Sequence, residues 1–293
     1  MKRRHAVLIS AVAGAMALSA CSTHAPSETR AWPTPSPVAA DVPVTDTAAP
    51  APAAPRFVWQ DVTGQGHEAD RDATRYRAQF GADPAPGIEI VHATGSQPGD
   101  TVPCTLGPAV DKGWLTAGHC ARDFSADQYL MGSATGDPQL LGTASAPAGP
   151  VDAAVVRTSG ATVTKIAGTW PVAGVLTPKG VRDLVRLGDP VCFDGAVSGV
   201  VCGERLSDDA DGLLVFSHAA QHGDSGAPLF LVDSVTHNAA LIGIVKSTDT
   251  TSAHATYIEA ALLATGTLAR LDPGVTAFGS PVSGQFSQRI TSQ

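Results

Sequence analysis

The sequence is poor in charge and has no excess of basic residues. Charged side chains make up 16% of the chain, and 19 lysines and arginines stand against 27 aspartates and glutamates, for a formal net charge of −8. Binding to nucleic acid is driven largely by positive charge, so this balance argues against nucleic acid as a partner. Hydrophobic residues make up 43% of the chain, which is enough for a packed core.

The N-terminal apolar run, residues 6–20, is too short to cross a membrane. It follows the positive start MKRR, and the two together predict a signal peptide over 1–20. The four residues LSAC, 18–21, resemble the lipobox of bacterial lipoproteins, in which the cysteine is lipidated and becomes the mature N-terminus. The alternative is a free or paired Cys21 in an ordinary secreted protein. In that case Leu18 would stand where signal peptidase prefers a small side chain.

Cysteine is scarce, and its count is odd. The five cysteines are Cys21, Cys104, Cys120, Cys192 and Cys202. In an exported protein an odd number leaves one cysteine to be explained. If Cys21 carries lipid, the other four are enough for two disulfides in an oxidising compartment.

The segment after Cys21 lacks large apolar side chains. Alanine, proline and threonine dominate residues 22–56, so this segment cannot bury a core and is expected to be a disordered tether. Residues 57–86 are mixed in composition, and the sequence assigns them no role. The expected organisation is a signal peptide over 1–20, a lipidated cysteine and linker over 21–56, an N-terminal extension over 57–86, a folded domain over 87–271 and a tail over 272–293.

From Gly87 onward, short apolar runs alternate with turn residues. The runs are IEIVHA (88–93), GWLTA (113–117), VDAAVVRT (151–158), LLVFS (213–217), APLFLV (227–232) and ALIGIVKS (240–247). Many short strands broken by Gly, Pro and Asp predict an all-β sandwich or barrel. EAALLATGTLARL, 259–271, has helical spacing and predicts one helix near the end.

Ser225 lies in the stretch QHGDSGAPLF, 221–230. Gly, Asp and Ser are also the usual residues of tight turns, so these letters alone do not identify a nucleophile. A serine hydroxyl needs a base, and the base needs a group that fixes its tautomer. His119 in GWLTAGHCA and Asp152, at the start of an apolar run, are the candidates.

These motifs, in this order, resemble the chymotrypsin-like serine proteases. TAGHC (116–120), PVDAAVV (150–156) and GDSGAP (223–228) are similar to the family's histidine, aspartate and serine motifs. The small bacterial branch of streptogrisins and alpha-lytic protease is the most similar, and the resemblance covers about 87–271. It implies two six-stranded antiparallel β-barrels of the chymotrypsin type with a C-terminal helix.

The resemblance also implies a role for each motif residue. Ser225 would attack the scissile carbonyl, His119 would transfer the proton, and Asp152 would orient His119. The N–H groups of Gly223 and Ser225 would form the oxyanion hole. Two disulfides are implied, Cys104–Cys120 and Cys192–Cys202. Asp224 would be buried behind the oxyanion turn and is expected to need a cationic partner that the sequence does not name.

Two positions depart from the family pattern. Gln221 stands where larger relatives have a cysteine that pins the serine loop. Lys246-Ser247-Thr248 replaces the Ser-Trp-Gly or Ser-Gly-Gly segment that binds substrate backbone. Either Lys246 takes the place of the serine that supports the catalytic aspartate, or a shift of one residue puts Ser247 there.

The specificity pocket is expected to have an apolar base. The family's pocket-base position is occupied by Ala219, and Lys246 and Ser247 are expected at the pocket wall. An aspartate at the base would select Lys or Arg, so the expected preference is not trypsin-like. His218 and His222 are interpreted as rim residues, because no HExxH motif or His–Cys cluster indicates a metal. No cofactor is expected.

The resulting hypothesis is a monomeric serine endopeptidase, anchored to the bacterial cell envelope through lipidated Cys21 and acting on protein or peptide substrates. A catalytically silent protease fold used as an envelope binding module is the alternative, and the presence of all three triad residues argues against it. An esterase of the α/β-hydrolase type would have G-x-S-x-G and the order Ser, Asp, His. Here the second residue after Ser225 is Ala227, and the histidine comes first.

Overall fold

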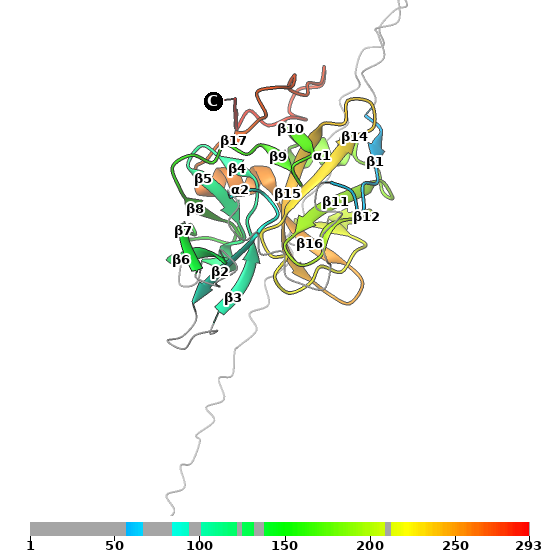
Figure 1. The fold of residues 1–293 in the computed structure, drawn as a ribbon. Coiled ribbons are helices and arrows are strands. Elements are labelled where there is room, and N and C mark those ends of the chain that lie inside the picture. Colours follow the sequence, from blue (N-terminus) through cyan, green and yellow to red (C-terminus); the bar gives the residue numbers. More distant parts are fainter. Residues whose placement is uncertain are drawn as a thin grey trace, which may run out of the picture. The chain divides into compact units, whose positions relative to one another are not determined.

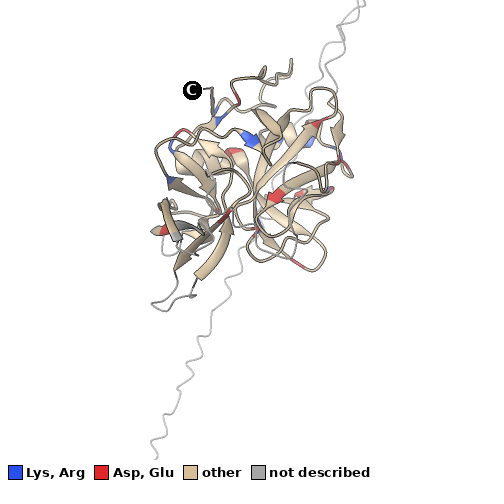
Figure 2. Ribbon diagram, viewed as in Figure 1, with Lys and Arg blue, Asp and Glu red and all other residues tan. Residues whose placement is uncertain are grey.

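The computed structural model describes residues 57–66, 84–93, 101–121, 125–131, 138–208 and 212–292 (Figure 1). The expected signal peptide, Cys21 and the Ala/Pro-rich linker lie outside the described residues. So does most of the expected extension, including 67–83. In the part that is described, no helix is both long and apolar enough to cross a membrane. Basic and acidic residues are interspersed along the ribbon (Figure 2).

The later part of the chain forms a closed barrel of six antiparallel strands. Its strands are β11 (Pro190–Gly195), β12 (Gly199–Asp208), β13 (Leu214–Phe216), β14 (Pro228–Asp233), β15 (Ala239–Thr248) and β16 (Ala253–Tyr257). The ladder runs β14-β11-β12-β13-β16-β15 and returns to β14. Closure removes the unpaired edges within this ring. Inward side chains such as Phe193, Phe216 and Leu229 are fully buried in its core.

A second sheet contains six neighbouring strands from the earlier part of the chain. They are β2 (Glu89–Ala93), β3 (Thr101–Thr105), β5 (Gly113–Thr116), β6 (Ser125–Met131), β7 (Pro138–Ser145) and β8 (Ala154–Arg157). Their order is β3-β2-β6-β7-β8-β5. Just after β3, Gly107 N donates to Leu115 O at 2.8 Å and joins the two ends of the row. A Cβ on Gly107 would lie 2.7 Å from that carbonyl, so only glycine allows this approach.

The remaining elements extend or cover these two barrels. They are β1 (Trp59–Gln60), β4 (Ala109–Val110), η1 (Gly118–Cys120), β9 (Lys165–Ile166), β10 (Trp170–Val175), α1 (Pro178–Leu184), α2 (Ile258–Thr265), β17 (Ala269–Arg270) and β18 (Ile290–Thr291). β1 pairs with β14, so part of segment 57–66 joins the sheet of the later barrel. β18 pairs with β17, which brings residues 290–291 onto the earlier sheet.

The C-terminal helix is shorter than the helix predicted over 259–271. α2 ends at Thr265, because Gly266 adopts a left-handed conformation (φ 63°) and closes the helix. Thr267 N then donates to Leu262 O at 3.0 Å. Beyond this cap the chain continues as β17, whose Ala269 pairs with β4, so the apolar spacing of the last residues belongs to a strand. The expected all-β fold with a C-terminal helix is confirmed, but the extent of that helix was wrong.

Both disulfides implied by the resemblance are present, Cys104–Cys120 and Cys192–Cys202. Cys192 and Cys202 are directly opposite each other on β11 and β12. Cys104 is on β3, and Cys120 ends η1, so the first disulfide joins two parts of the earlier barrel.

Candidate active site

His119 is held by a short turn directly after β5. Gly118 precedes it, and a Cβ there would lie 2.8 Å from both Ala153 N and Asp152 Oδ1. Glycine therefore lets this turn approach the start of β8. His119 N donates to Asp152 Oδ1 at 2.8 Å, and His119 Nδ1 lies 2.9 Å from Asp152 Oδ2. The two residues, 33 positions apart, form a two-point contact that fixes the orientation of the imidazole ring.

The environment of Asp152 keeps its carboxyl group ionised. Its side chain is 14% exposed, whereas that of His119 is 47% exposed. Burial alone would raise the pKa of Asp152, but the hydrogen bonds from His119 and the electrostatic interactions with His119 and Lys246 outweigh it. The pKa is held below its ordinary value of 3.8. An ionised Asp152 accepts the proton of Nδ1, which leaves Nε2 on the opposite edge of the ring as the acceptor.

Ser225 lies in a tight turn, residues 221–227, which we call the serine turn. Gly223 and Gly226 have φ values of 106° and 91°. Only glycine adopts such values readily, and a Cβ on Gly226 would lie 2.5 Å from Thr105 O. Gly226 N donates to Val245 O at 2.8 Å, which attaches the turn to β15. These contacts place the partly buried Ser225 side chain at the tip of the turn.

The N–H groups that flank that of Asp224 in the serine turn are left open. Asp224 N donates to Gln221 O, and Ala227 N donates to Asp224 O, each at 3.0 Å. Within the described part of the chain, the N–H groups of Gly223 and Ser225 donate no hydrogen bond. The N–H groups on either side of that of Asp224 are therefore available to an acceptor from outside the protein.

Asp224 is completely buried, but a cationic partner does not balance it. Its Oδ1 accepts hydrogen bonds from Val197 N and Ser198 N, both at 3.0 Å. Its Oδ2 accepts from Ser198 Oγ at 2.6 Å and Gln221 N at 2.8 Å. The expected cationic partner is thus absent among the described residues. Four neutral donors satisfy the carboxylate instead, because the 196–198 turn points two backbone N–H groups at one oxygen.

Gln221 also contributes its side chain. Gln221 Nε2 donates to Ser198 Oγ at 3.1 Å, and Ser198 in turn donates to Asp224. A polar link therefore holds the start of the serine turn.

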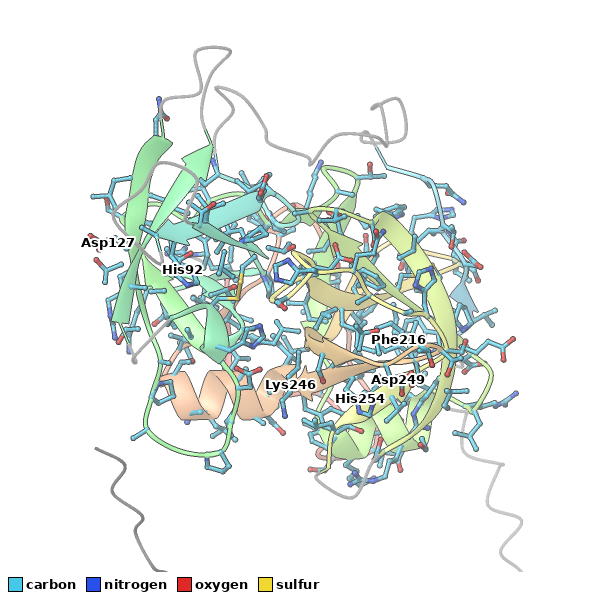
Figure 3. All side chains as sticks on the ribbon, turned by 90° about the horizontal axis from the view of Figure 1, so that it is seen from below. His92, Asp127, Phe216, Lys246, Asp249 and His254 are labelled. Atoms are coloured by element: carbon cyan, nitrogen blue, oxygen red, sulfur yellow. A yellow bond between two sulfur atoms is a disulfide. The ribbon has the colours of Figure 1, made fainter. Side chains whose placement is uncertain are left out.

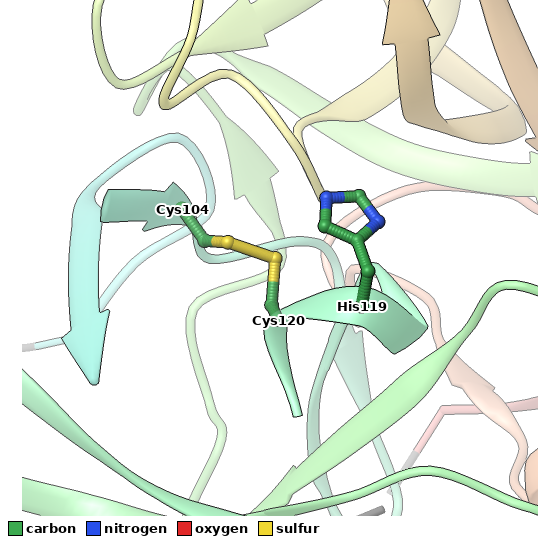
Figure 4. Close-up of side chains that lie close together, drawn as sticks. All are labelled: Cys104, His119 and Cys120. Atoms are coloured by element: carbon green, nitrogen blue, oxygen red, sulfur yellow. A yellow bond between two sulfur atoms is a disulfide. The ribbon is translucent and has the colours of Figure 1, made fainter. Parts of the chain in front are cut away.

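The chain segments that carry His119 and Ser225 meet at one disulfide. Thr105 N donates to Ser225 O at 2.7 Å, and Thr105 directly follows Cys104. Cys120 Sγ lies 3.9 Å from the same carbonyl oxygen, and Cys120 directly follows His119. Figure 4 shows the His119 ring beside the Cys104–Cys120 disulfide. A ring nitrogen of His119 lies within 4.8 Å of both sulfurs, but their mutual bond leaves neither free as a thiolate ligand.

The expected pocket residues occupy different environments. Ala219 is half-buried, and its carbonyl lies 2.9 Å from Nδ1 of the preceding His218, while Ser247 is exposed. Lys246 is half-buried at an irregularity of the β15–β16 pairing and acts electrostatically on Asp152. It lies where the two barrels meet (Figure 3).

Thr105 and Ser198 were missed by sequence reasoning. Thr105 is fully buried at the end of β3, and Ser198 lies in the turn between β11 and β12. A polar residue directly after a half-cystine at the end of a predicted strand is the signal that could have indicated Thr105. No local signal connects Ser198 with Asp224.

No family model matches the chain, and no curated protein matches it. Solved structures with a similar arrangement include a glutamic acid-specific serine protease, at 22% identity over 63% of this chain and 98% of that one, with a TM-score of 0.44. A Nocardiopsis protease is 18% identical over 64% and 98%, with a TM-score of 0.43. The protease Anisep from Arthrobacter nicotinovorans is 16% identical over 61% and 94%, with a TM-score of 0.37. At these levels the likeness assigns no activity, substrate or site residue to this chain.

Proposed function

We propose that this protein is a serine endopeptidase that hydrolyses peptide bonds through an acyl-enzyme. The observation that carries the proposal is the meeting, around one disulfide, of an oriented His119–Asp152 pair and a serine turn with two open N–H groups. A histidine–aspartate pair or an exposed serine alone is common in proteins. Their convergence with a ready anion site is the arrangement that acyl transfer requires.

The proposed reaction follows from the orientation of the ring. Ser225 Oγ attacks the scissile carbonyl carbon while its proton moves to Nε2 of His119. The imidazolium, stabilised by the ionised Asp152, then gives that proton to the leaving amine as the C–N bond breaks. Water repeats both steps on the ester: its oxygen attacks, its proton moves to His119, and the proton returns to Ser225 Oγ as the acid leaves.

The open N–H groups of Gly223 and Ser225 would bind the negative oxygen of the tetrahedral intermediate. Each such donor contributes about 3 kcal/mol of transition-state stabilisation in a water-poor site. The turn offers these two donors and keeps the intervening N–H of Asp224 occupied within the protein. The site therefore does not need to reorganise when the charge develops.

A fluorophosphonate probe tests the proposal directly. The folded, purified protein should be labelled once, and peptide mapping by mass spectrometry should place the label on Ser225. An unlabelled but folded protein would instead favour the silent binding module, and a label on another serine would contradict the assignment of the nucleophile.

We expect the enzyme not to cleave after arginine or lysine. Ala219 offers neither charge nor a side-chain hydrogen bond at the proposed pocket base, and burying an unpaired guanidinium there would cost several kcal/mol. Profiling on a mixed peptide library should show small or medium apolar residues before the scissile bond. Dominant cleavage after glutamate would identify Lys246 as the selecting residue. Dominant cleavage after arginine would show that Ala219 does not form the pocket base.

We further propose that Cys21 is lipidated and anchors the domain outside the cytoplasm. Two disulfides in the folded part are typical of oxidising compartments, and LSAC at 18–21 supports the lipid site. Several acyl chains on one residue hold a protein stably, whereas one does not. Replacing Cys21 with serine should move the protein from the membrane fraction to the soluble fraction. Unchanged membrane association of the Cys21→Ser variant would refute the anchor.

A further inference from the structure

Thr105 connects the earlier barrel to Gly223 and Ser225, the residues on either side of Asp224. Its backbone N donates to Ser225 O at 2.7 Å, and its Oγ1 donates to Gly223 O at 2.7 Å. The same hydroxyl accepts from Ala196 N at 3.0 Å. Thr105 O accepts from Thr116 Oγ1 at 2.9 Å, and the whole residue is 0% exposed. One buried threonine therefore forms hydrogen bonds to three points of the later barrel.

The two carbonyls that Thr105 holds belong to the residues whose N–H groups are open. The peptide between Gly223 and Asp224 is fixed at both ends, because its C=O accepts from Thr105 and its N–H donates to Gln221 O. The carbonyl two residues further along the chain, that of Ser225, is fixed by Thr105 N. The N–H groups of Gly223 and Ser225 lie on either side of the fixed peptide, so its orientation sets theirs.

Gly223 cannot hold this geometry by itself. Its φ of 106° is accessible to glycine, which also adopts many other conformations. A Cβ at Gly223 would lie 2.7 Å from Val197 Cγ2, so a more restricted residue does not fit. Inside the turn, the hydrogen bond from Asp224 N to Gln221 O restrains one end of this peptide. The Thr105 hydroxyl restrains the other end from outside the turn.

We propose that Thr105 is a positioning residue that aligns the oxyanion hole from the opposite barrel. This inference rests on the proposed peptidase function. Removing the hydroxyl leaves the Gly223 carbonyl and the Ala196 N–H without their partner. The peptide is then held only at its N–H end, by Gln221 O, and its carbonyl end can shift. A misplacement of about 1 Å near a reacting centre lowers the rate by about 100-fold.

The test compares Thr105→Val, which has the same shape without the hydroxyl, with Thr105→Ser, which keeps it. We expect Thr105→Val to lower kcat by about 10- to 100-fold with little change in KM, because the lost interaction acts on the transition state. Fluorophosphonate labelling should slow in parallel, while the pH at which activity rises should not move, because the His119–Asp152 pair is untouched. Thr105→Ser should restore kcat to within about three-fold of wild type.

Thr177→Val is the matched control for a general loss of stability. Thr177, at the start of α1, is also buried and also bridges two segments. Its Oγ1 accepts from Gly180 N within α1 and donates to Gly284 O in the C-terminal segment. The Thr177→Val variant should have a lower thermal midpoint of unfolding. Its kcat, measured at a temperature well below that midpoint, should equal that of the wild type. If Thr105→Val does not fold, Thr105→Ala should show the same loss of kcat. The smaller side chain leaves more space around the Gly223 carbonyl and the Ala196 N–H, which have lost their partner.

The outcomes separate this inference from the proposed function. If the wild-type protein is neither active nor labelled, the peptidase proposal fails. If the wild type is labelled and Thr105→Val or Thr105→Ala reacts at the wild-type rate, the positioning role is overturned while the peptidase proposal stands. A loss of kcat that Thr105→Ser does not restore would likewise overturn the role of the hydroxyl.

Discussion

Replacing Ser225 with alanine is expected to lower kcat by about 10⁶-fold, to the level that binding and the oxyanion hole alone support. Alanine removes the attacking oxygen and leaves the two open N–H groups of the turn in place. His119→Ala should cost nearly as much, because the hydroxyl is not activated without a base. Combining both changes should add little, since the residues act as one unit.

Peptide hydrolysis and fluorophosphonate labelling measure the loss together. Ser234→Ala is a suitable control, because Ser234 also lies in a turn. Among the described residues its one hydrogen bond is a backbone bond, from Ser234 N to Val58 O. That variant should keep wild-type activity. Cleavage by Ser225→Ala at the wild-type rate would exclude the proposed mechanism.

The sequence was most informative where chemistry is local. The strand pattern predicted the all-β fold, and the order of the three motifs suggested that His119 and Asp152 would meet. The structure places these two side chains 2.9 Å apart. Short motifs such as TAGHC carry this information because the glycine, the histidine and the cysteine of one turn each satisfy a different spatial constraint.

The sequence was least informative where the partner is remote. Asp224 is satisfied by Val197 and Ser198, 27 and 26 residues away, and this depends on the conformation of a turn between two strands. Thr105 reaches Gly223 across 118 residues. The helix boundary failed for a related reason, because residues after Gly266 become a strand only through pairing with β4 and β18.

Replacing Asp152 with asparagine is expected to lower kcat by about 10⁴-fold while leaving the fold intact. The asparagine amide can donate a hydrogen bond to Nδ1 of His119. The ring would then carry its proton on Nε2, the nitrogen that must accept the proton of Ser225. The variant also lacks the negative charge that stabilises the imidazolium. KM should change little, because Asp152 contacts His119 and not the substrate in the proposed mechanism.

The pH dependence of stability provides an independent readout of the same carboxylate. The pKa of Asp152 is lower in the folded protein than its ordinary value of 3.8. Its ionised form therefore stabilises the fold above that value, and this contribution is lost as the pH falls through the lower, folded-state pKa. Denaturant unfolding at several pH values measures this contribution. Below pH 3.8, the free energy of unfolding of Asp152→Asn should fall less steeply with acid than that of the wild type, because the variant has no carboxylate at this position to protonate.

Asp127→Asn provides the control, because Asp127 is an exposed carboxylate on β6 that accepts from Thr143 Oγ1 at 2.6 Å. It should retain full activity. If Asp152→Asn keeps wild-type kcat, Asp152 does not orient the base. If instead its kcat falls but its stability declines with acid as in the wild type, the hydrogen bonds to His119 and the charge of Lys246 do not hold the pKa of Asp152 down. Only the combined loss of activity and of acid sensitivity supports one ionised carboxylate that both stabilises the fold and orients the base.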